Sequence, residues 1–171
     1  MRTLGIDPSS SVTGIALVED FQLRSVHLWM AKGKDVASNL LRFKSQIESS
    51  HWSSHIDSIC VEKVSVTINM NAVRRIAYME AIALLIAEEM GCSSAHINPT
   101  HARKVVFGKG NIKKDEVYEH IVDAYPTIRF LPFKNGGSDQ TDAVVLALAM
   151  QMESKSVSEW HVAGRPIFRL A

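Results

Sequence analysis

The chain has 171 residues, of which 46% are hydrophobic and 22% charged, and its formal net charge is +1. These proportions are typical of one globular domain, and they exclude a chain that is disordered throughout. No apolar run approaches the roughly 20 residues of a membrane span. Because the chain has two cysteines and no secretory signal after Met1, we expect a reduced, cytoplasmic location and no membrane partner.

The first third of the chain predicts strands. Apolar runs at 2–6 and 14–18 flank a serine-rich turn and indicate a hairpin, and 22–30 alternates like a half-buried third strand. Apolar residues at helical spacing then predict an amphipathic helix over 35–50. The run at 56–62 indicates a buried fourth strand that ends in a carboxylate.

Helices dominate the rest. The helix predicted over 71–90 is apolar on both faces, so we expect it to pack against a second layer or a second subunit. The elements expected after it are a strand at 95–98, a helix at 99–107, a helix that Asn111 caps, a loop at 127–137 and a helix over 139–152 that Ser138 caps.

This order of elements predicts an α/β domain with a mixed five-stranded sheet flanked by helices. Three early strands followed by alternating helices and strands are the order of a ribonuclease H-like fold, an analogy that does not by itself establish function. We expect this domain to occupy residues 1–153, and 154–171 to form a C-terminal tail.

Four acidic residues are placed at the ends of predicted elements: Asp7, Glu62, Asp139 and Asp142. Clustered carboxylates repel one another, so at neutral pH they take up protons or bind cations. Mg²⁺ suits such hard oxygen ligands, and two ions about 4 Å apart are suited to phosphodiester displacement. Taken singly, each residue also fits an ordinary role as a turn residue, a capping charge or a partner of Lys63.

Four segments carry a family resemblance: Gly5-Ile6-Asp7-Pro8-Ser9, Val61-Glu62-Lys63-Val64, Val105-Val106-Phe107-Gly108-Lys109-Gly110 and Ser138-Asp139-Gln140-Thr141-Asp142-Ala143. In order and spacing they resemble the motifs of RuvC-type Holliday-junction resolvases, over about residues 2–152. The chain is similar to a diverged, phage-type member of that family.

The resemblance implies a function and a set of residues. The family's metal-binding catalytic carboxylates match Asp7, Glu62, Asp139 and Asp142. Arg103 and Lys114 match basic residues needed for DNA binding or catalysis. The family acts as a homodimer, here through helix 71–90, and nicks opposed strands of a four-way DNA junction. The implied chemistry uses two Mg²⁺ ions, which Mn²⁺ can replace, and leaves 5′-phosphate ends.

Two positions depart from the family pattern. Bacterial members have an aromatic residue where this chain has Ser65, so distortion of the junction either depends on Ile68 or Met70 or is weaker. They also have glycine directly after the proline of the first motif, where this chain has Ser9. The cleavage sequence preference and any branch-migration motor as partner stay open.

Basic residues cluster in one stretch without acidic neighbours, and two more begin the apolar helix: Arg103, Lys104, Lys109, Lys113 and Lys114, with Arg74 and Arg75. Such a cluster predicts contact with DNA phosphates, although a solvated helix face explains lysines equally well. The segment 108–110 lacks the ending of a phosphate-binding P-loop, and the histidines and cysteines lack the paired spacing of a zinc site.

Three other functions remain as alternatives. An ATPase or sugar-kinase-like domain opens with a similar Gly-Ile-Asp turn, but it needs a second domain for which this chain lacks the length. A non-catalytic junction-binding module does not need four carboxylates near DNA phosphates. A related nuclease acting on an RNA–DNA hybrid, a flap or a replication fork keeps the chemistry and changes only the substrate.

Overall fold

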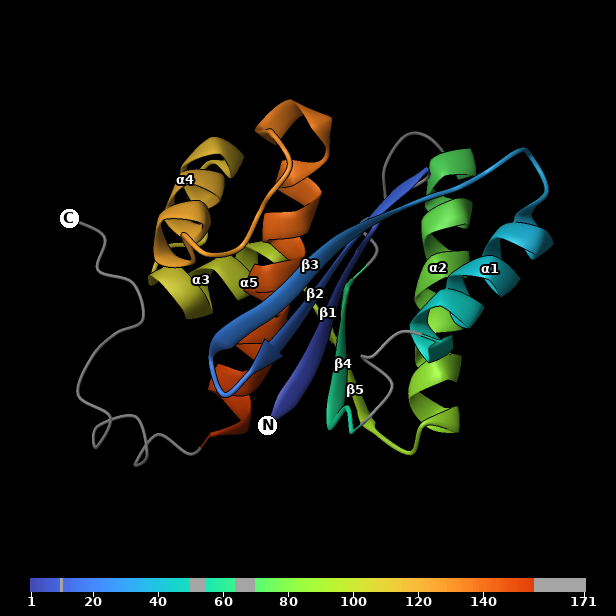
Figure 1. Cartoon of the computed structure of the whole chain (residues 1–171), viewed down its shortest axis with the longest axis horizontal. Helices are drawn as coiled ribbons and strands as arrows, with labels where there is room; N and C mark the ends of the chain where they lie inside the picture. The colour runs from blue at the N-terminus through green and yellow to red at the C-terminus, as the bar shows by residue number, and fades with distance from the viewer. Residues whose placement is uncertain (10, 50–54, 64–69, 156–171) are drawn as a thin grey trace.

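The computed structural model describes residues 1–9, 11–49, 55–63 and 70–155. A twisted sheet forms its centre, with helices on both faces (Figure 1). The strands are β1 (Arg2–Pro8), β2 (Val12–Glu19), β3 (Gln22–Met30), β4 (Ser58–Glu62) and β5 (Ser93–Ile97). The helices are α1 (Val36–Ser49), α2 (Met70–Glu89), α3 (Pro99–Phe107), α4 (Lys114–Ala124) and α5 (Gly137–Ser154), with a short 3₁₀ turn, η1 (Phe133–Asn135).

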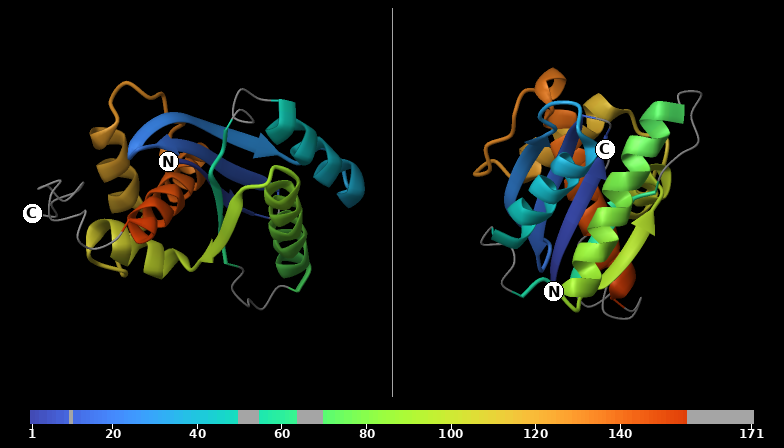
Figure 2. Two further views of the ribbon diagram at one scale, coloured as in Figure 1. Left: turned by 90° about the horizontal axis from the view of Figure 1, so that it is seen from below. Right: turned by 90° about the vertical axis from the view of Figure 1, so that its right-hand side faces the viewer.

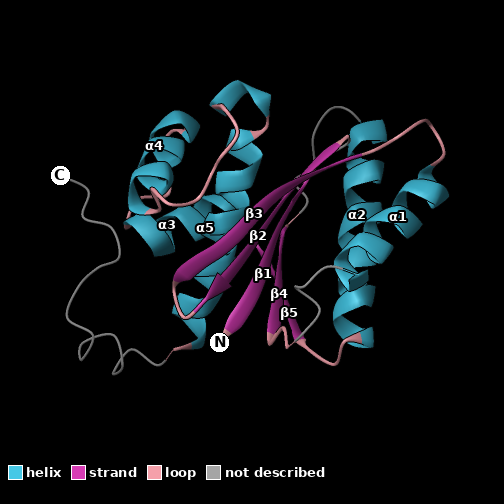
Figure 3. Ribbon diagram, viewed as in Figure 1, coloured by secondary structure: helices cyan, strands magenta, loops and turns pink. Residues whose placement is uncertain are grey.

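The sheet order is β3-β2-β1-β4-β5. β1 pairs antiparallel with β2, and β2 with β3, whereas β1 and β4, and β4 and β5, pair in parallel. The predicted α/β fold with a mixed five-stranded sheet is therefore confirmed (Figure 3). Because β1 lies in the middle and runs parallel to β4, the carboxyl ends of these two strands meet at the same end of the sheet.

Each face of the sheet has its own hydrophobic core. On one face α1 and α2 cover Leu4, Ile6 and Ile15, while on the other α3, α4 and α5 cover a second apolar cluster (Figure 2). Helix α5 is buried along most of its length, which explains why its sequence is apolar on every side. The expected strands and helices thus all have a covered face.

Two glycines let α5 lie directly against the sheet. A Cβ added at Gly5 would stand 2.0 Å from the Ala143 carbonyl oxygen, and one at Gly14 would stand 2.0 Å from that of Asp139. No side chain fits at either position, because both contacts are with helix backbone. The amino end of α5 is thereby held over the β1–β2 pair.

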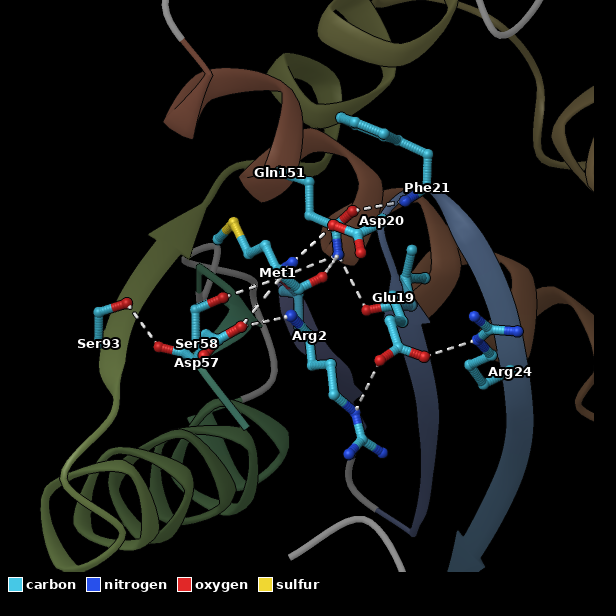
Figure 4. A network of polar contacts seen from close by, with 12 residues as sticks. Met1, Arg2, Glu19, Asp20, Phe21, Arg24, Asp57, Ser58, Ser93 and Gln151 are labelled. Carbon is cyan, nitrogen blue, oxygen red and sulfur yellow. Dashed lines mark hydrogen bonds and ion pairs between the residues drawn. The ribbon is translucent and has the colours of Figure 1, made fainter. Parts of the chain in front are cut away.

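The carboxyl end of α5 is anchored by one buried amide (Figure 4). Gln151 Oε1 accepts from the Phe21 backbone N–H at 2.8 Å, and its Nε2 donates to the carbonyls of Val18 and Met1 at 2.9 and 3.0 Å and to Thr3 Oγ1 at 3.1 Å. Phe21 has a φ of +64° in the β2–β3 turn. The amide therefore ties the last helix to the first hairpin.

The two expected caps are wrong. Helix α4 begins at Lys114 behind Lys113 rather than at Asn111, because Ile112 must first reach the core, where it is buried. Helix α5 begins at Gly137 behind Gly136, one residue before Ser138, and no side chain caps it. Glycine is required there, since a Cβ at Gly137 would stand 2.2 Å from the Leu131 carbonyl oxygen.

The described part of the chain contains no helix with both the length and the apolarity to cross a membrane. The expected tail falls almost wholly outside the described residues, as do Ser65 and Ile68. The division into 1–153 and 154–171 therefore stays a prediction.

Candidate active site at the carboxyl end of the central strands

The strand register places two carboxyl groups side by side. Ile6 of β1 pairs with Val61 of β4, so Asp7 and Glu62 are the next residues on two adjacent parallel strands. Both side chains project toward α5, because side chains alternate along a strand and Gly5 already contacts that helix. Burial of Asp7 and, after it, the neighbouring charge of Glu62 raise the pKa of Asp7.

Helix α5 brings the other two carboxylates to the same end of the sheet. Asp142 is buried, and its charge acts on Asp7. Asp139, one turn earlier, is half-buried and is influenced by the charges of Asp142 and Lys114. The contact between Gly14 and the Asp139 backbone fixes the height of this turn above β1 and β2.

Two cationic side chains meet at Asp142. Arg103 of α3 donates from a terminal guanidinium nitrogen to Asp142 Oδ1 at 2.9 Å. Lys114, the first residue of α4, places its Nζ 2.7 Å from Oδ2. The Arg103 side chain is largely buried, whereas that of Lys114 is 53% exposed and can leave the carboxylate without unpacking the core.

The protonation of the cluster follows from burial and charge. Burial raises the pKa of Asp7 well above its ordinary value, and the charges of Glu62 and Asp142 raise it further. Burial also raises the pKa of Asp139. Burial alone would lower the pKa of Lys114, but Asp142, Asp7 and Asp139 outweigh it and raise that pKa. The raised pKa of Asp7 and the two basic side chains therefore both offset the negative charge of the site.

The donor set fits a hard divalent cation. Carboxylate oxygens are the ligands that Mg²⁺ prefers, and among the described residues Oδ2 of Asp142 has only the half-exposed ammonium of Lys114 as its partner. As the side chains stand, no three His, Cys, Asp or Glu groups among the described residues are close enough to enclose an ion. Asp142 pairs with Arg103 and Lys114, while Asp7 and Glu62 lie side by side on neighbouring strands.

Comparison with known proteins identifies relatives of this chain. The family profile described as "Crossover junction endodeoxyribonuclease RuvC" matches residues 3–150. The chain belongs to the RuvC family. Among curated RuvC proteins, that of Trichlorobacter lovleyi is 28% identical over 86% of this chain and 83% of its own, and that of Cutibacterium acnes is 30% identical over 86% and 76%.

Solved structures agree on the fold. The RuvC structure of Thermus thermophilus superposes with a TM-score of 0.73 over 90% of this chain and 95% of its own, at 18% sequence identity. A structure of the same protein in complex with Holliday junction substrate gives 0.74 over 90% and 94%, at 16% identity. The chain thus has the RuvC fold, in its ribonuclease H-like arrangement, as the element order predicted.

The structure divides the basic residues of this RuvC relative into separate groups. Arg103 and Lys114 turn inward to Asp142, which the spacing alone did not predict. Lys104, Lys109 and Lys113 are exposed around α3 and the start of α4. Arg74 and Arg75 are exposed on α2, on the opposite face of the sheet (Figure 1).

Sequence reasoning missed two residues that hold the chain just before α5 in place. Gln140 is buried between Asp139 and Asp142, and its Oε1 accepts from the Leu131 backbone N–H at 2.9 Å. Tyr118 of α4 donates to the Leu131 carbonyl at 2.9 Å. Together they fasten the loop before α5. The adjacency of Gln140 to the two acidic residues was the one available signal.

Proposed function

We propose that this chain is a metal-dependent endonuclease that nicks opposed strands of four-way DNA junctions as a homodimer. The observation that carries the proposal is the convergence of Asp7, Glu62 and Asp142 at one end of the sheet, in a member of the RuvC family. A buried cluster of like charges is costly to stability, and a cation-dependent reaction gives a reason for it. The complex of the Thermus thermophilus relative with Holliday junction substrate supports the choice of DNA.

Each part of the site has a distinct task in the proposed reaction. The four residues that would hold Mg²⁺, or Mn²⁺ in its place, are Asp7, Glu62, Asp139 and Asp142. The bound ions would supply Lewis-acid stabilisation of the charge on the phosphodiester and activation of water. Because burial and the neighbouring charges raise the pKa of Asp7, a bound cation would favour the ionised form of this carboxyl group.

Arg103 and Lys114 would have different roles toward the negative charge of Asp142 and of the DNA phosphate. Arg103 is largely buried and positions Asp142 through one oxygen. Lys114 is exposed enough to move from Asp142 to a phosphate oxygen, where it would stabilise the charge that grows in the transition state. The exposed Lys104, Lys109 and Lys113 extend the positive surface along which a DNA backbone would lie.

The surface of α2 supports the dimer. Met70 and Leu85 lie about four turns apart on one side of this helix, and they are 58% and 47% exposed. An apolar stripe of this kind on a helix is suited to a second copy of the same helix. A pair of chains joined here would carry two carboxylate sites, as two nicks across one junction require.

Cleavage of a labelled synthetic four-way junction tests the proposal. Linear duplex, a fork and an RNA–DNA hybrid serve as the other substrates, each with Mg²⁺, Mn²⁺ or EDTA. We expect paired symmetric nicks on the junction with either metal, no nicks in EDTA, and nicks that a ligase reseals because they carry 5′-phosphates. Asp7→Asn should lower the rate by at least about 10²-fold.

Asp123→Asn is the matched control, because Asp123 is exposed at the far end of α4. It should cleave like the unaltered protein. A junction that binds but stays intact with every divalent ion would instead establish a non-catalytic binding module. Preferential cleavage of the hybrid or fork would move the same chemistry to another substrate, and single rather than paired nicks would contradict the dimer.

A further inference from the structure

A hollow lies on the face of the sheet away from the carboxylates. It has a volume of about 100 Å³ and opens between the end of β3, the start of α1 and the first half of α2. Its lining includes the buried Trp29 and Met79 and the more exposed Leu40 and Tyr78. We propose that this hollow receives one unstacked nucleobase of the DNA bound at the carboxylate site, an inference that rests on the proposed function.

The walls suit a planar aromatic ring. Tyr78 is 46% exposed, and its hydroxyl makes no hydrogen bond to a described residue. A half-exposed aromatic side chain beside an apolar hollow offers a stacking surface that accepts any base, because every base has a π-face. The volume is small compared with the sites of drug-sized ligands, so one ring system is the natural occupant.

The rim carries the charge that a nucleotide needs. Lys34 and Arg75 line the opening, and both are exposed. Neither forms an ion pair with a described residue, and none of the described residues that line the hollow is acidic. A base is linked to a phosphate on each side, so an apolar ring site with two cations at its edge matches a nucleotide in both shape and charge.

Two polar side chains that line the hollow, Asn39 and Ser9, are already engaged. Asn39 accepts from the Lys32 backbone N–H and donates to the Asp35 carbonyl, both at 2.8 Å. Ser9 donates to the Val12 carbonyl and accepts from the Val12 N–H. These groups have little left with which to read a base edge, so the hollow should accept any of the four bases with little preference.

The hollow and the carboxylates open at the same end of the sheet. Ser9, which lines the hollow, follows Asp7 by two residues at the end of β1, and β3 runs in the same direction as β1. A strand whose phosphate reaches Asp7 therefore passes over this end of the sheet. A nucleotide a short way along that strand lies above the opening between α1 and α2.

Photocrosslinking with the full chain tests the inference. Four-way junctions carry a single 5-iododeoxyuridine at successive positions from the crossover, and the Asp7→Asn protein is used so that they stay intact. We expect one position to crosslink in preference, with the adduct mapping by mass spectrometry to Tyr78 or Trp29. Tyr78→Ala should lower the crosslink at least tenfold, and Tyr78→Phe should keep it because the ring remains.

Leu41→Ala is the matched control, since Leu41 is 64% exposed on α1 and lies outside the hollow. It should crosslink normally. Adducts elsewhere at every position would overturn the inference, as would sedimentation showing that Tyr78→Ala dissociates a dimer, because the hollow would then be a subunit contact. Junction cleavage by the unaltered protein is measured separately. Cleavage without the crosslink would refute only the base-binding role of the hollow. The crosslink without cleavage would refute only the nuclease activity.

Discussion

The two ends of α5 differ in how well their buried polar groups are paired. At its carboxyl end, Gln151 is neutral, buried and satisfied by partners from the first two strands and the turn between β2 and β3. At its amino end, Asp142 is equally buried but charged, and it stands among other carboxyl groups with two basic side chains beside it. One end has every polar group paired, which favours stability, while the other retains a conflict that a ligand can relieve.

The largest expected effect comes from removing the hydrogen bonds at the carboxyl end of α5. Gln151→Met keeps the length of the side chain but leaves the Phe21 N–H and the Val18 and Met1 carbonyls without their partner. We expect the free energy of unfolding to fall by about 3 kcal/mol, because several buried polar groups lose hydrogen bonds. Chemical denaturation measures this. Gln46→Met, at an exposed position of α1, should change stability by less than about 0.5 kcal/mol.

The next effect tests how α5 is held above the sheet. Gly14→Ala places a methyl group against the Asp139 carbonyl, so the helix must move away from β2. We expect a loss of about 2 kcal/mol in stability together with slower junction cleavage, since Asp139 and Asp142 move with the helix. Gly91→Ala meets nothing within 4 Å and has only its φ of +65° to accommodate, so it should cost about 1 kcal/mol and leave cleavage unchanged. Equal cleavage by both variants would contradict this account.

Removing one buried carboxyl group from the cluster near the amino end of α5 should stabilise the metal-free protein. Folding raises the pKa of Asp7, so the folded chain keeps a proton that the unfolded chain releases. Stability therefore falls as the pH rises from about 4 toward the raised pKa, and that loss is complete above it. Asp7→Asn lacks this loss.

Thermal denaturation in EDTA across this pH range checks the expectation for Asp7→Asn. Its melting temperature should exceed that of the unaltered protein by a few degrees at neutral pH, and the two should agree near pH 4. A lower melting temperature for Asp7→Asn at neutral pH would show that the carboxyl pair stabilises the fold.

The smallest effect concerns the competition between Lys114 and a metal ion for Asp142. Lys114→Met removes the cation that stands 2.7 Å from Oδ2, so Mg²⁺ should bind more tightly, by roughly two- to fivefold. Calorimetric titration measures this independently of cleavage. Lys113→Met is the control, because Lys113 is exposed and forms no ion pair with Asp142. Weaker binding after Lys114→Met would mean that the lysine does not compete with the ion.

The fold was predictable because each element has a local signal. The alternating strand at 22–30 and the buried run at 56–62 depend on residue periodicity, and both are found as β3 and β4. The helix starts at Asn111 and Ser138 were wrong because burial of Ile112 and the close packing of Gly137 decide where those helices begin. Such tertiary constraints leave no mark in the neighbouring sequence.

In the candidate site too, features with a local sequence signal were predicted and those set by tertiary contacts were not. The four carboxylates were found because they stand at element ends in family-like motifs, and their catalytic role stays a prediction. That Arg103 and Lys114 pair with Asp142 was not foreseen, because a basic stretch reads the same whether it faces DNA or its own protein. Gln151 was also missed, since its partners lie 130 to 150 residues away.

The contact between α5 and the two glycines also affects the order in which the protein can be made. Asp7 leaves the ribosome early, but the carboxylates of α5 follow more than 130 residues later, and the groove at Gly5 and Gly14 has no other described helix to fill it. The first strands must therefore wait for the last helix before the α5 face of the sheet closes. A nascent or truncated chain would carry Asp7 and Glu62 without the rest of the cluster, so a chain still being synthesised should be unable to cut DNA.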